Sequence, residues 1–428
     1  MDTIFALSSG SPPAAIAVIR ISGPQAGGAL RALAGKLPPP REAKLATLRD
    51  PATLGILDRA LTLWFPGPGS ATGEDLAEIH AHGGRAVVRA IESALSGIAG
   101  LRPALPGEFT RRALMNSRID LAEAEGLADL LEAETEGQRR QALALAGGAL
   151  SGKVAEWQEQ LLMLSARVEA MLDFADESDV TADETEISLI NNVIDEISTS
   201  WRHWLARPWS ERLRDGLTVA IAGPPNAGKS TLLNAIATRE AAIVSAQAGT
   251  TRDVIEVALA LDGIPFRFAD TAGLHGGTGD AIEAEGMRRA QAWIASADML
   301  LWLGSPDDVP DHPHACRIAA QVDHMAIASG ADLALSAQTG EGMAELHRWL
   351  VDRARTLLPR EGEVAMNERH RAALQAAVDA LDDQAAQPDP LLLAEHLRAA
   401  RTAIDAITGQ AGTEDMLDAL FGRFCIGK

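Results

Sequence analysis

The sequence is poor in cysteine and has no long apolar run. Only Cys316 and Cys425 occur among 428 residues, too few for a disulfide framework. The first residues, MDTIFALSSG, lack the basic start and apolar core of a signal peptide. No stretch approaches the roughly 18 consecutive apolar residues that span a bilayer, and no lipidation pattern occurs. We therefore expect a soluble, cytoplasmic protein that does not contact membranes.

Positive charge is also scarce. Lysine and arginine number 38 against 59 aspartates and glutamates, and the net charge of −21 argues against a protein that coats nucleic acid through its overall field. The imbalance is uneven, because residues 1–118 carry a net charge of +4 whereas residues 119–210 carry −13. A nucleic-acid partner is therefore expected to meet the protein locally, with the basic first segment taking part.

Apolar periodicity divides the chain into four segments. Residues 1–118 mix strand-like runs such as AAIAVIRI with helical patterns such as GRAVVRAIESALSGI, which predicts a small α+β domain. Residues 119–210 and 361–428 are helical in pattern, and residues 211–360 alternate strands and helices, with Asp262-Gly263 marking a hairpin. We therefore predict a multidomain α/β and α protein, in which an α/β domain with a mainly parallel sheet is inserted between two halves of one helical bundle.

A phosphate-binding motif opens the α/β segment. Residues 223–230, GPPNAGKS, fit G-x-x-x-x-G-K-[ST] between a predicted strand and a predicted helix. The small Gly228 lets backbone N–H groups surround the phosphates, Lys229 supplies positive charge, and the Ser230 hydroxyl can bind magnesium. The segment is therefore predicted to bind a nucleoside triphosphate.

Two later motifs have the order and spacing of GTPase switch segments. Residues 249–253, GTTRD, place a threonine hydroxyl near the magnesium, and residues 270–273, DTAG, end a predicted strand beside the γ-phosphate. Leu274 stands where many GTPases have the glutamine that orients the attacking water. Another group must therefore position the water. Asn226 suits a potassium ion in place of an arginine finger, with stabilisation of the loop's turn as its alternative role.

The signature for guanine is incomplete. The usual Asn-Lys-x-Asp motif reads Ala320-Gln321-Val322-Asp323, so the aspartate is kept and the asparagine and lysine are not. Residues 336–342, SAQTGEG, fit the loop whose backbone contacts the base edge. Guanine is favoured, and an ATPase is the alternative. The proline-rich link between Leu303 and Ile318 is short, so the helix usual at this point is expected to be truncated.

Motifs outside the nucleotide segment are more distinctive. They are DTI at 2–4, VIRISGP at 18–24, TGED at 72–75, HGG at 82–84, PGEFTRRA at 106–113, DLAEAE at 120–125 and the terminal FCIGK at 424–428. With the nucleotide motifs, they make the chain resemble the MnmE (TrmE) family of tRNA uridine-modification GTPases over essentially its whole length. A generic translation or ribosome-assembly GTPase would share only the α/β domain.

The resemblance implies a homodimeric, potassium-activated GTPase with a Ras-like P-loop domain. It would act on tRNA in a heterotetramer or larger complex with the flavoprotein MnmG (GidA). The complex would add an aminomethyl or carboxymethylaminomethyl group to carbon 5 of the wobble uridine, with 5-formyl- or methylene-tetrahydrofolate as the one-carbon source. Residues 1–118 would bind folate and dimerise. The alternative is a GTP-switched RNA or ribosome assembly factor without folate chemistry.

The resemblance also assigns residues to each ligand. Folate would meet Arg20, Glu78, Arg118 and Lys428. Magnesium would meet Ser230 and Thr251, and potassium would meet Asn226, Ser245, Gln247 and Thr250. GTP or GDP would contact Asn226, Ala227, Gly228, Lys229, Ser230, Thr231, Ser245, Ala246, Gln247, Ala248, Gly249, Thr250, Thr251, Asp270, Thr271, Ala272, Gly273, Asp323, Ser336 and Ala337. Glu283 would position the attacking water, with Glu285 as the alternative.

Three further side chains, those of Cys425, His80 and His82, could take part in chemistry. Cys425 is interpreted as structural, because small buried thiols are common. His80 and His82 alternate on a predicted strand, a spacing that permits metal binding. Because no further cysteine or acidic cluster accompanies them, we interpret both as structural or adjacent to the folate.

Overall fold

The computed structural model describes residues 2–174, 184–239, 255–270, 291–323, 330–360, 362–384, 389–409, 417, 420–422, 424 and 426–427. The chain forms two compact units. The first comprises Met1–Ala128, Leu145–Val168 and Leu397–Lys428, and the second comprises Asp129–Ala144 and Glu169–His396. None of the described helices combines the length and the apolar character that a membrane span requires.

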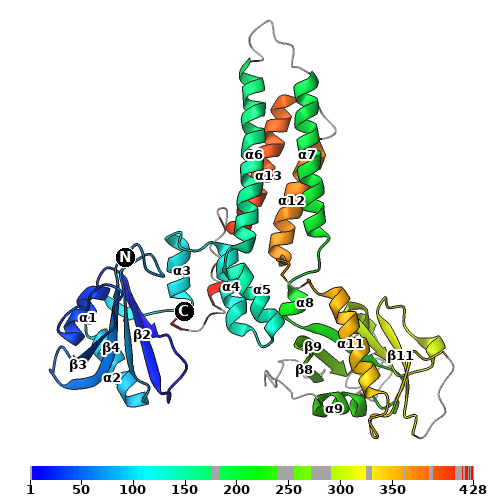
Figure 1. The fold of residues 1–428 in the computed structure, drawn as a ribbon, viewed down its shortest axis with the longest axis horizontal. Helices are drawn as coiled ribbons and strands as arrows, with labels where there is room; N and C mark the ends of the chain where they lie inside the picture. Colours follow the sequence, from blue (N-terminus) through cyan, green and yellow to red (C-terminus); the bar gives the residue numbers. More distant parts are fainter. Residues whose placement is uncertain are drawn as a thin grey trace, which may run out of the picture. The chain divides into compact units, whose positions relative to one another are not determined.

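The first unit is built on a mixed six-stranded sheet (Figure 1). Its strands are β1 (Thr3–Leu7), β2 (Ile16–Ser22), β3 (Lys44–Arg49), β4 (Ile56–Phe65), β5 (Leu76–His82) and β6 (Leu101–Pro103), in the order β3-β4-β5-β2-β1-β6. Only β1 and β6 pair in parallel. Helices α1 (Ala26–Ala34) and α2 (Arg85–Ser96) share a buried core with this sheet. The predicted α+β architecture is confirmed.

Successive side chains along the strands of this sheet point to opposite faces. Ile19 and Ile21 of β2 and Ile79 of β5 are fully buried in the core with the helices. Because side chains alternate across a strand, Arg20 and Glu78 point to the opposite face. That second face is only partly covered, and it carries two of the residues assigned to folate, Arg20 and Glu78.

The chain's last described residues pack against its beginning. Helices α3 (Glu108–Met115) and α4 (Leu121–Glu132) follow the sheet. Leu121, Ala124 and Ala128 of α4 form a buried cluster with Leu420, Phe421 and Phe424. Ile426 pairs with Pro106, and the Ser8 hydroxyl donates a hydrogen bond of 2.7 Å to the carbonyl of Gly427. The C-terminal tail therefore runs beside β1 and the start of α3.

The segments with helical patterns are helices. They are α5 (Glu136–Ala146), α6 (Ala149–Phe174) and α7 (Glu184–Leu205) before the α/β segment, and α12 (Glu368–Gln384) and α13 (Pro390–Thr408) after it. In the second unit, α7 contacts α12. Buried apolar side chains on both helices, such as Ile194 and Leu381, repeat at helical spacing.

The second unit contains a six-stranded sheet with one antiparallel pair. Its strands are β7 (Leu217–Ala222), β8 (Ile255–Leu261), β9 (Ile264–Asp270), β10 (Met299–Trp302), β11 (Ala315–Ala320) and β12 (Leu333–Leu335), in the order β12-β11-β10-β7-β9-β8. Only β8 and β9 are antiparallel, and Asp262-Gly263 forms their turn with φ values of 49° and 76°. The predicted parallel sheet and hairpin are confirmed.

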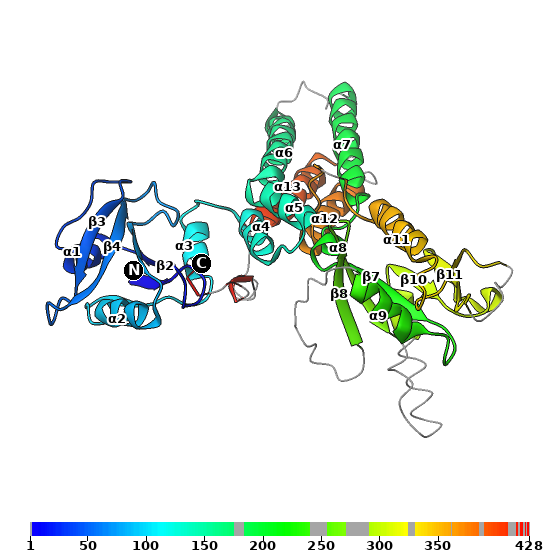
Figure 2. The same cartoon turned by 60° about the horizontal axis from the view of Figure 1, so that its bottom comes forward.

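Helices α9 (Lys229–Arg239) and α11 (Met343–Leu357) cover one face of this sheet (Figure 2). Leu217, Val219 and Ile221 of β7 lie in the core with both helices, whereas Ala220 and Ala222 belong to a cluster on the other face. In the link between β10 and β11, the only helical element is the three-residue 3₁₀ helix Pro306–Asp308. The expected truncation is therefore present.

Candidate functional site

The phosphate-binding motif forms the turn between β7 and α9. Gly223 follows the strand with φ of 152°, and a Cβ at this position would lie 3.0 Å from the backbone of Leu303. Gly228 precedes the helix with φ of 92°, which favours glycine. Because α9 begins at Lys229, its free N–H groups face the loop and make a site suited to anions.

Lys229 is buried, with 5% of its surface exposed. Its ammonium donates hydrogen bonds of 2.9 Å to the carbonyls of Gly223 and Pro224. A buried charge needs such partners, and these two keep the ammonium within the loop, where phosphate oxygens would bind. The next residue, Ser230, is exposed at the start of α9.

Three separate segments meet at a cavity of about 140 Å³ beside this loop. Gly228 and Thr231 line it from the phosphate loop and α9. Gln321 and Asp323 line it from the end of β11, and Ser336, Ala337 and Gln338 line it from the end of β12. Ligands of parallel α/β sheets bind at the carboxyl ends of the strands. The cavity therefore lies where a base attached to phosphates in the loop would be expected.

The turn after β12 is held by its own hydrogen bonds. Ser336 is fully buried, and its hydroxyl accepts a hydrogen bond from the amide of Thr339 at 3.2 Å. The Ser336 amide donates to the carbonyl of Glu341 at 3.0 Å, and its carbonyl accepts from the amide of Gly340 at 2.8 Å. These bonds give the Ser336-Ala337 backbone a defined position at the cavity wall.

Many residues assigned to the nucleotide from sequence lie outside the described residues. They are Ser245, Ala246, Gln247, Ala248, Gly249, Thr250, Thr251, Thr271, Ala272, Gly273 and Glu283, together with the alternative Glu285. Asp270 is described as the last residue of β9, where its backbone is in register with Ile221 of β7, but its side chain is not described.

The first unit brings two of the residues assigned to folate together. Arg20 and Glu78 are directly paired across β2 and β5. The Arg20 guanidinium donates to one Glu78 oxygen from Nε at 3.2 Å and from Nη2 at 3.0 Å, and His80 Nε2 lies 3.2 Å from the other. The Arg20 guanidinium also lies 5.8 Å from the centre of the Phe109 ring.

The remaining residues considered for this region lie elsewhere. Arg118 is exposed after α3, and a Cβ on Gly73 would lie 3.2 Å from its Cγ. His82 contacts the carboxylate of Asp58, with Nδ1 and Oδ1 2.8 Å apart. Lys428 and Cys425 are not among the described residues, although Gly427 is.

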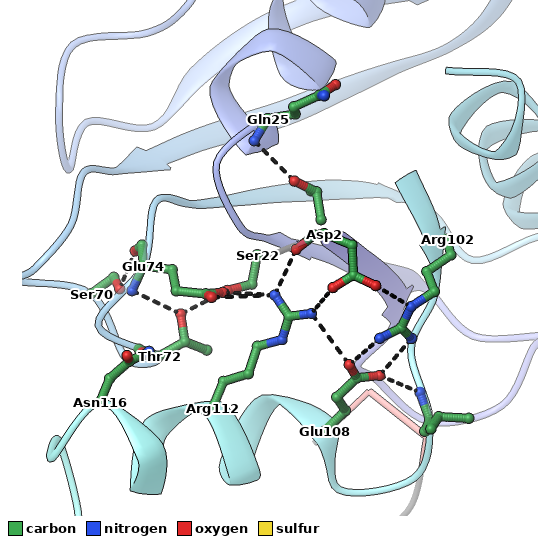
Figure 3. A network of polar contacts seen from close by, with 12 residues as sticks. Asp2, Ser22, Gln25, Ser70, Thr72, Glu74, Arg102, Glu108, Arg112 and Asn116 are labelled. Atoms are coloured by element: carbon green, nitrogen blue, oxygen red, sulfur yellow. Dashed lines mark hydrogen bonds and ion pairs between the residues drawn. The ribbon is translucent and has the colours of Figure 1, made fainter. Parts of the chain in front are cut away.

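An ion-pair network between β1, β6 and α3 was not anticipated from sequence (Figure 3). Arg112 donates to the carbonyl of Asp2 at 2.9 Å, to its carboxylate at 2.7 Å and to Glu74 at 3.0 Å. Arg102 bonds Asp2 and Glu108. These residues fall within or beside the motifs DTI, TGED and PGEFTRRA. The motifs therefore include charged residues whose ion pairs hold the start of β1, the strand β6 and the helix α3 together. In the sequence, this role is indicated only by the charges of these residues.

The network lowers the pKa of two carboxyl groups, those of Asp2 and Glu108. Burial would raise the pKa of Glu108, but hydrogen bonds from Arg102 and from the amide of Leu105 outweigh it and lower this pKa. The pKa of Asp2 is lowered chiefly by its hydrogen bond from Arg102. The arginines of the network therefore favour the ionised form of both carboxyl groups.

The fold and the loop geometry define a P-loop nucleotide-binding protein. Residues 3–118 match the family model described as GTP-binding protein TrmE N-terminus, and residues 121–425 match the model described as MnmE helical domain. The chain belongs to the MnmE family of tRNA modification GTPases.

Two relatives match over all or nearly all of their lengths. The tRNA modification GTPase MnmE of Novosphingobium aromaticivorans is 57% identical over 435 residues, covering 100% of both chains. Its counterpart from Rhizorhabdus wittichii is 58% identical, covering 100% of this chain and 97% of the relative. Among solved structures, the G domain of the T. maritima FeoB iron transporter aligns with 32% of this chain and 98% of its own at 21% identity and a TM-score of 0.24, too low to define a fold.

Proposed function

We propose that the protein is a cytoplasmic GTPase that takes part in modifying carbon 5 of the wobble uridine of tRNA. The observation that supports this most is the cavity where the phosphate loop meets Asp323 and the Ser336-Ala337 turn, in a chain that matches tRNA modification GTPases over its whole length. The modification would be an aminomethyl or carboxymethylaminomethyl group.

Nucleoside analysis of tRNA tests this function directly. In cells that lack the protein, the modified wobble uridine should disappear, because the proposed reaction is the step that adds the group at carbon 5. Expression of the wild-type chain should restore it. An unchanged nucleoside profile in the deletion strain would contradict the proposal.

We propose four functional segments. Residues 1–118 would bind folate and dimerise, residues 119–210 and 361–428 would form the two halves of a helical domain, and residues 211–360 would bind and hydrolyse GTP. The protein would be a homodimer and would act on tRNA with the flavoprotein MnmG (GidA). The segment of positive charge, residues 1–118, is the part of this chain best suited to a polyanion.

The partly covered sheet face of the first unit supports both dimerisation and folate binding. Leu45, Leu61, His80 and Val18 stand opposite one another on four neighbouring strands, so they share this face. Leu45 is 54% exposed, Leu61 is 43% exposed, and Ile16 on the same face of β2 is 59% exposed. Such apolar exposure beside a charged pair suits a second subunit and a ligand with both apolar and anionic parts.

We propose that Arg20 and Glu78 bind 5-formyl- or methylene-tetrahydrofolate, together with Arg118 and Lys428. The arginines and the lysine would meet the folate carboxylates, and Glu78 would accept hydrogen bonds from the pterin N–H groups. The geometry suits this role, because Glu78 is only 16% exposed and is oriented by Arg20 on one oxygen and His80 on the other.

Calorimetry of the full-length protein with 5-formyl-tetrahydrofolate measures this binding. Arg20→Ala should raise the Kd by about 10- to 100-fold, since hydrogen bonds to charged groups contribute roughly 1.5–3 kcal/mol. Arg31→Ala, an exposed arginine on α1, is the matched control and should bind as the wild type does. If the wild type gives no signal, the assembly-factor alternative without folate chemistry is favoured.

Two residues at the phosphate loop, Ser230 and Asn226, are chemically suited to the proposed metal ions. Ser230 is an exposed residue at the start of α9, and its hydroxyl is a hard oxygen donor suited to magnesium, with Thr251 as its partner. Asn226 offers an amide oxygen in the loop, and we assign potassium to it with Ser245, Gln247 and Thr250. Bound there, the ions would neutralise charge on the phosphates. Asp323 would accept hydrogen bonds from guanine, and the Ser336-Ala337 backbone would contact the base edge.

We propose that Glu283 positions the attacking water, because Leu274 cannot hydrogen-bond it. Glu283→Ala should lower kcat for GTP by about 100-fold while the Kd of GDP changes less than about twofold, since loss of a general-base contact typically costs 10²–10⁴ in rate. Glu285→Ala is the matched control. Slow turnover by Glu285→Ala together with normal turnover by Glu283→Ala would exchange the two roles.

Wild-type turnover of GTP should also be much faster in potassium chloride than in sodium chloride. Equal rates in the two salts would rule out the potassium proposal.

A further inference from the structure

The outer surfaces of α1 and α2 in the first unit carry positive charge. Arg31 of α1, Lys36 just after it, and Arg85 and Arg89 of α2 are all exposed. The Arg85 guanidinium donates a hydrogen bond of 3.3 Å to the carbonyl of Pro12, a neutral group that does not compensate its charge. Among the residues that the structure describes, none of these four cations forms an ion pair with a carboxylate.

Few carboxylates offset this charge. Those of the ion-pair network, of Glu78 and of Asp58 pair with other side chains. Helix α1 contains no acidic residue, and α2 contains only Glu92. Burial raises the pKa of Glu92, which favours its neutral form. The two helices therefore hold a surplus of positive charge on the side that faces solvent.

The four cations lie on one side of the sheet and toward one end of it. Both helices pack on the same sheet face and both contact β4 and β5, so they are neighbours. Helix α1 follows β2 and α2 follows β5, and these two strands are antiparallel. The helices therefore begin at opposite ends of the sheet. The end of α1, with Arg31 and Lys36, thus lies toward the start of α2, with Arg85 and Arg89.

The neutral residues on these outer surfaces are small. Exposed positions beside the cations are Gly28, Ala32, Ala86 and Ser93. No large apolar side chain is exposed between residues 26 and 36 or between residues 85 and 97, all of which the structure describes. A stable protein interface buries an apolar centre, whereas a nucleic-acid backbone is bound by charge. The surface therefore suits a polyanion better than it suits a protein.

We propose that the outer surface of α1 and α2 binds the phosphate backbone of the tRNA substrate, through Arg31, Lys36, Arg85 and Arg89. This surface lies opposite the sheet face proposed for folate and the second subunit, so its cations stay exposed in a dimer. Contacts to phosphates position a nucleic acid without reading its sequence. The inference rests on the proposed function, since it names the part of this chain that holds the tRNA to be modified.

Fluorescence anisotropy of labelled tRNA with the full-length protein, measured at several salt concentrations, tests the inference. Arg85→Ala combined with Arg89→Ala should raise the Kd for tRNA about 10-fold at about 0.1 M salt. The slope of log Kd against log salt should fall by about 1 to 2, since each lost phosphate contact releases about one counterion fewer. The Kd of GDP should change less than about twofold, because the two arginines serve tRNA binding alone.

Two matched pairs separate a tRNA contact from general damage and from net charge. Arg85→Lys combined with Arg89→Lys keeps both charges and should bind tRNA within about twofold of the wild type. Arg348→Ala combined with Arg355→Ala removes two exposed arginines of α11 in the second unit and should also stay within about twofold.

Four results would overturn the inference. They are no tRNA binding by the wild type, unchanged binding by the alanine pair on α2, equal weakening by the alanine pair on α11, and a lysine pair no better than the alanine pair. Dissociation of the homodimer by the alanine pair on α2 would assign the surface to a second copy and overturn it too. The proposed function fails separately, if the deletion strain keeps its modified wobble uridine.

Discussion

Replacing Lys229 with alanine should raise the Kd for GDP and GTP by at least about 100-fold and abolish measurable GTP turnover. The ammonium is buried and is held by the carbonyls of Gly223 and Pro224 at 2.9 Å, so it is already placed where phosphate oxygens bind. Two charge-assisted hydrogen bonds to phosphate, at roughly 1.5–3 kcal/mol each, account for an effect of this size. Calorimetric titration with GDP measures it.

The matched control for this substitution is Lys36→Ala. Lys36 is an exposed lysine of the first unit, far along the sequence from the phosphate loop, and its loss should leave the Kd unchanged. In cells, Lys229→Ala should also leave the wobble uridine unmodified, as deletion does. A Kd within tenfold of the wild type would show that the loop binds phosphate mainly through its backbone N–H groups.

Arg112→Met should destabilise the first unit by about 3–5 kcal/mol, the usual effect of breaking a buried charge pair. The side chains of Arg112, Glu74 and Glu108 are each 11% exposed, and Arg112 also bonds Asp2. Without the Arg112 guanidinium, the carboxylates of Asp2 and Glu108 would keep only Arg102 as a cationic partner, and Glu74 would lose its pair with Arg112. Hydrogen exchange of the β1 and β6 amides in increasing denaturant measures the free energy of unfolding of this unit.

The control and the pH dependence make this prediction specific. Arg139→Met removes an exposed pair with Glu136, 50% and 52% exposed, and should change stability by less than about 1 kcal/mol. Because the folded-state pKa of Glu108 is lowered, its contribution is present above its unfolded pKa and is lost as the pH falls through the folded value. The wild-type first unit should therefore lose stability on acidification. Equal effects of the two variants would contradict the network's role.

Local patterns in the sequence were sufficient for the fold class and for the phosphate loop. Alternating and helical periodicities predicted the strands and helices, because they reflect which side chains face a core. The Asp262-Gly263 hairpin and the truncated link after Leu303 followed from turn chemistry and proline content. The motif at 223–230 predicted a loop between a strand and a helix. It could do so because its glycines and its lysine act within the loop itself, the glycines through their backbone conformation and the lysine through its charge.

Long-range pairing was decided by the tertiary structure alone. The register of β2 against β5 places Glu78 between Arg20 and His80, and α3 brings Arg112 to Asp2 and Glu74. The contact between Gln321 and Asn226 joins residues 95 positions apart. Periodicity depends on neighbours within a few residues, whereas these contacts depend on which strands and loops lie side by side. That arrangement comes from packing the whole sheet, so no single motif in the sequence contains it.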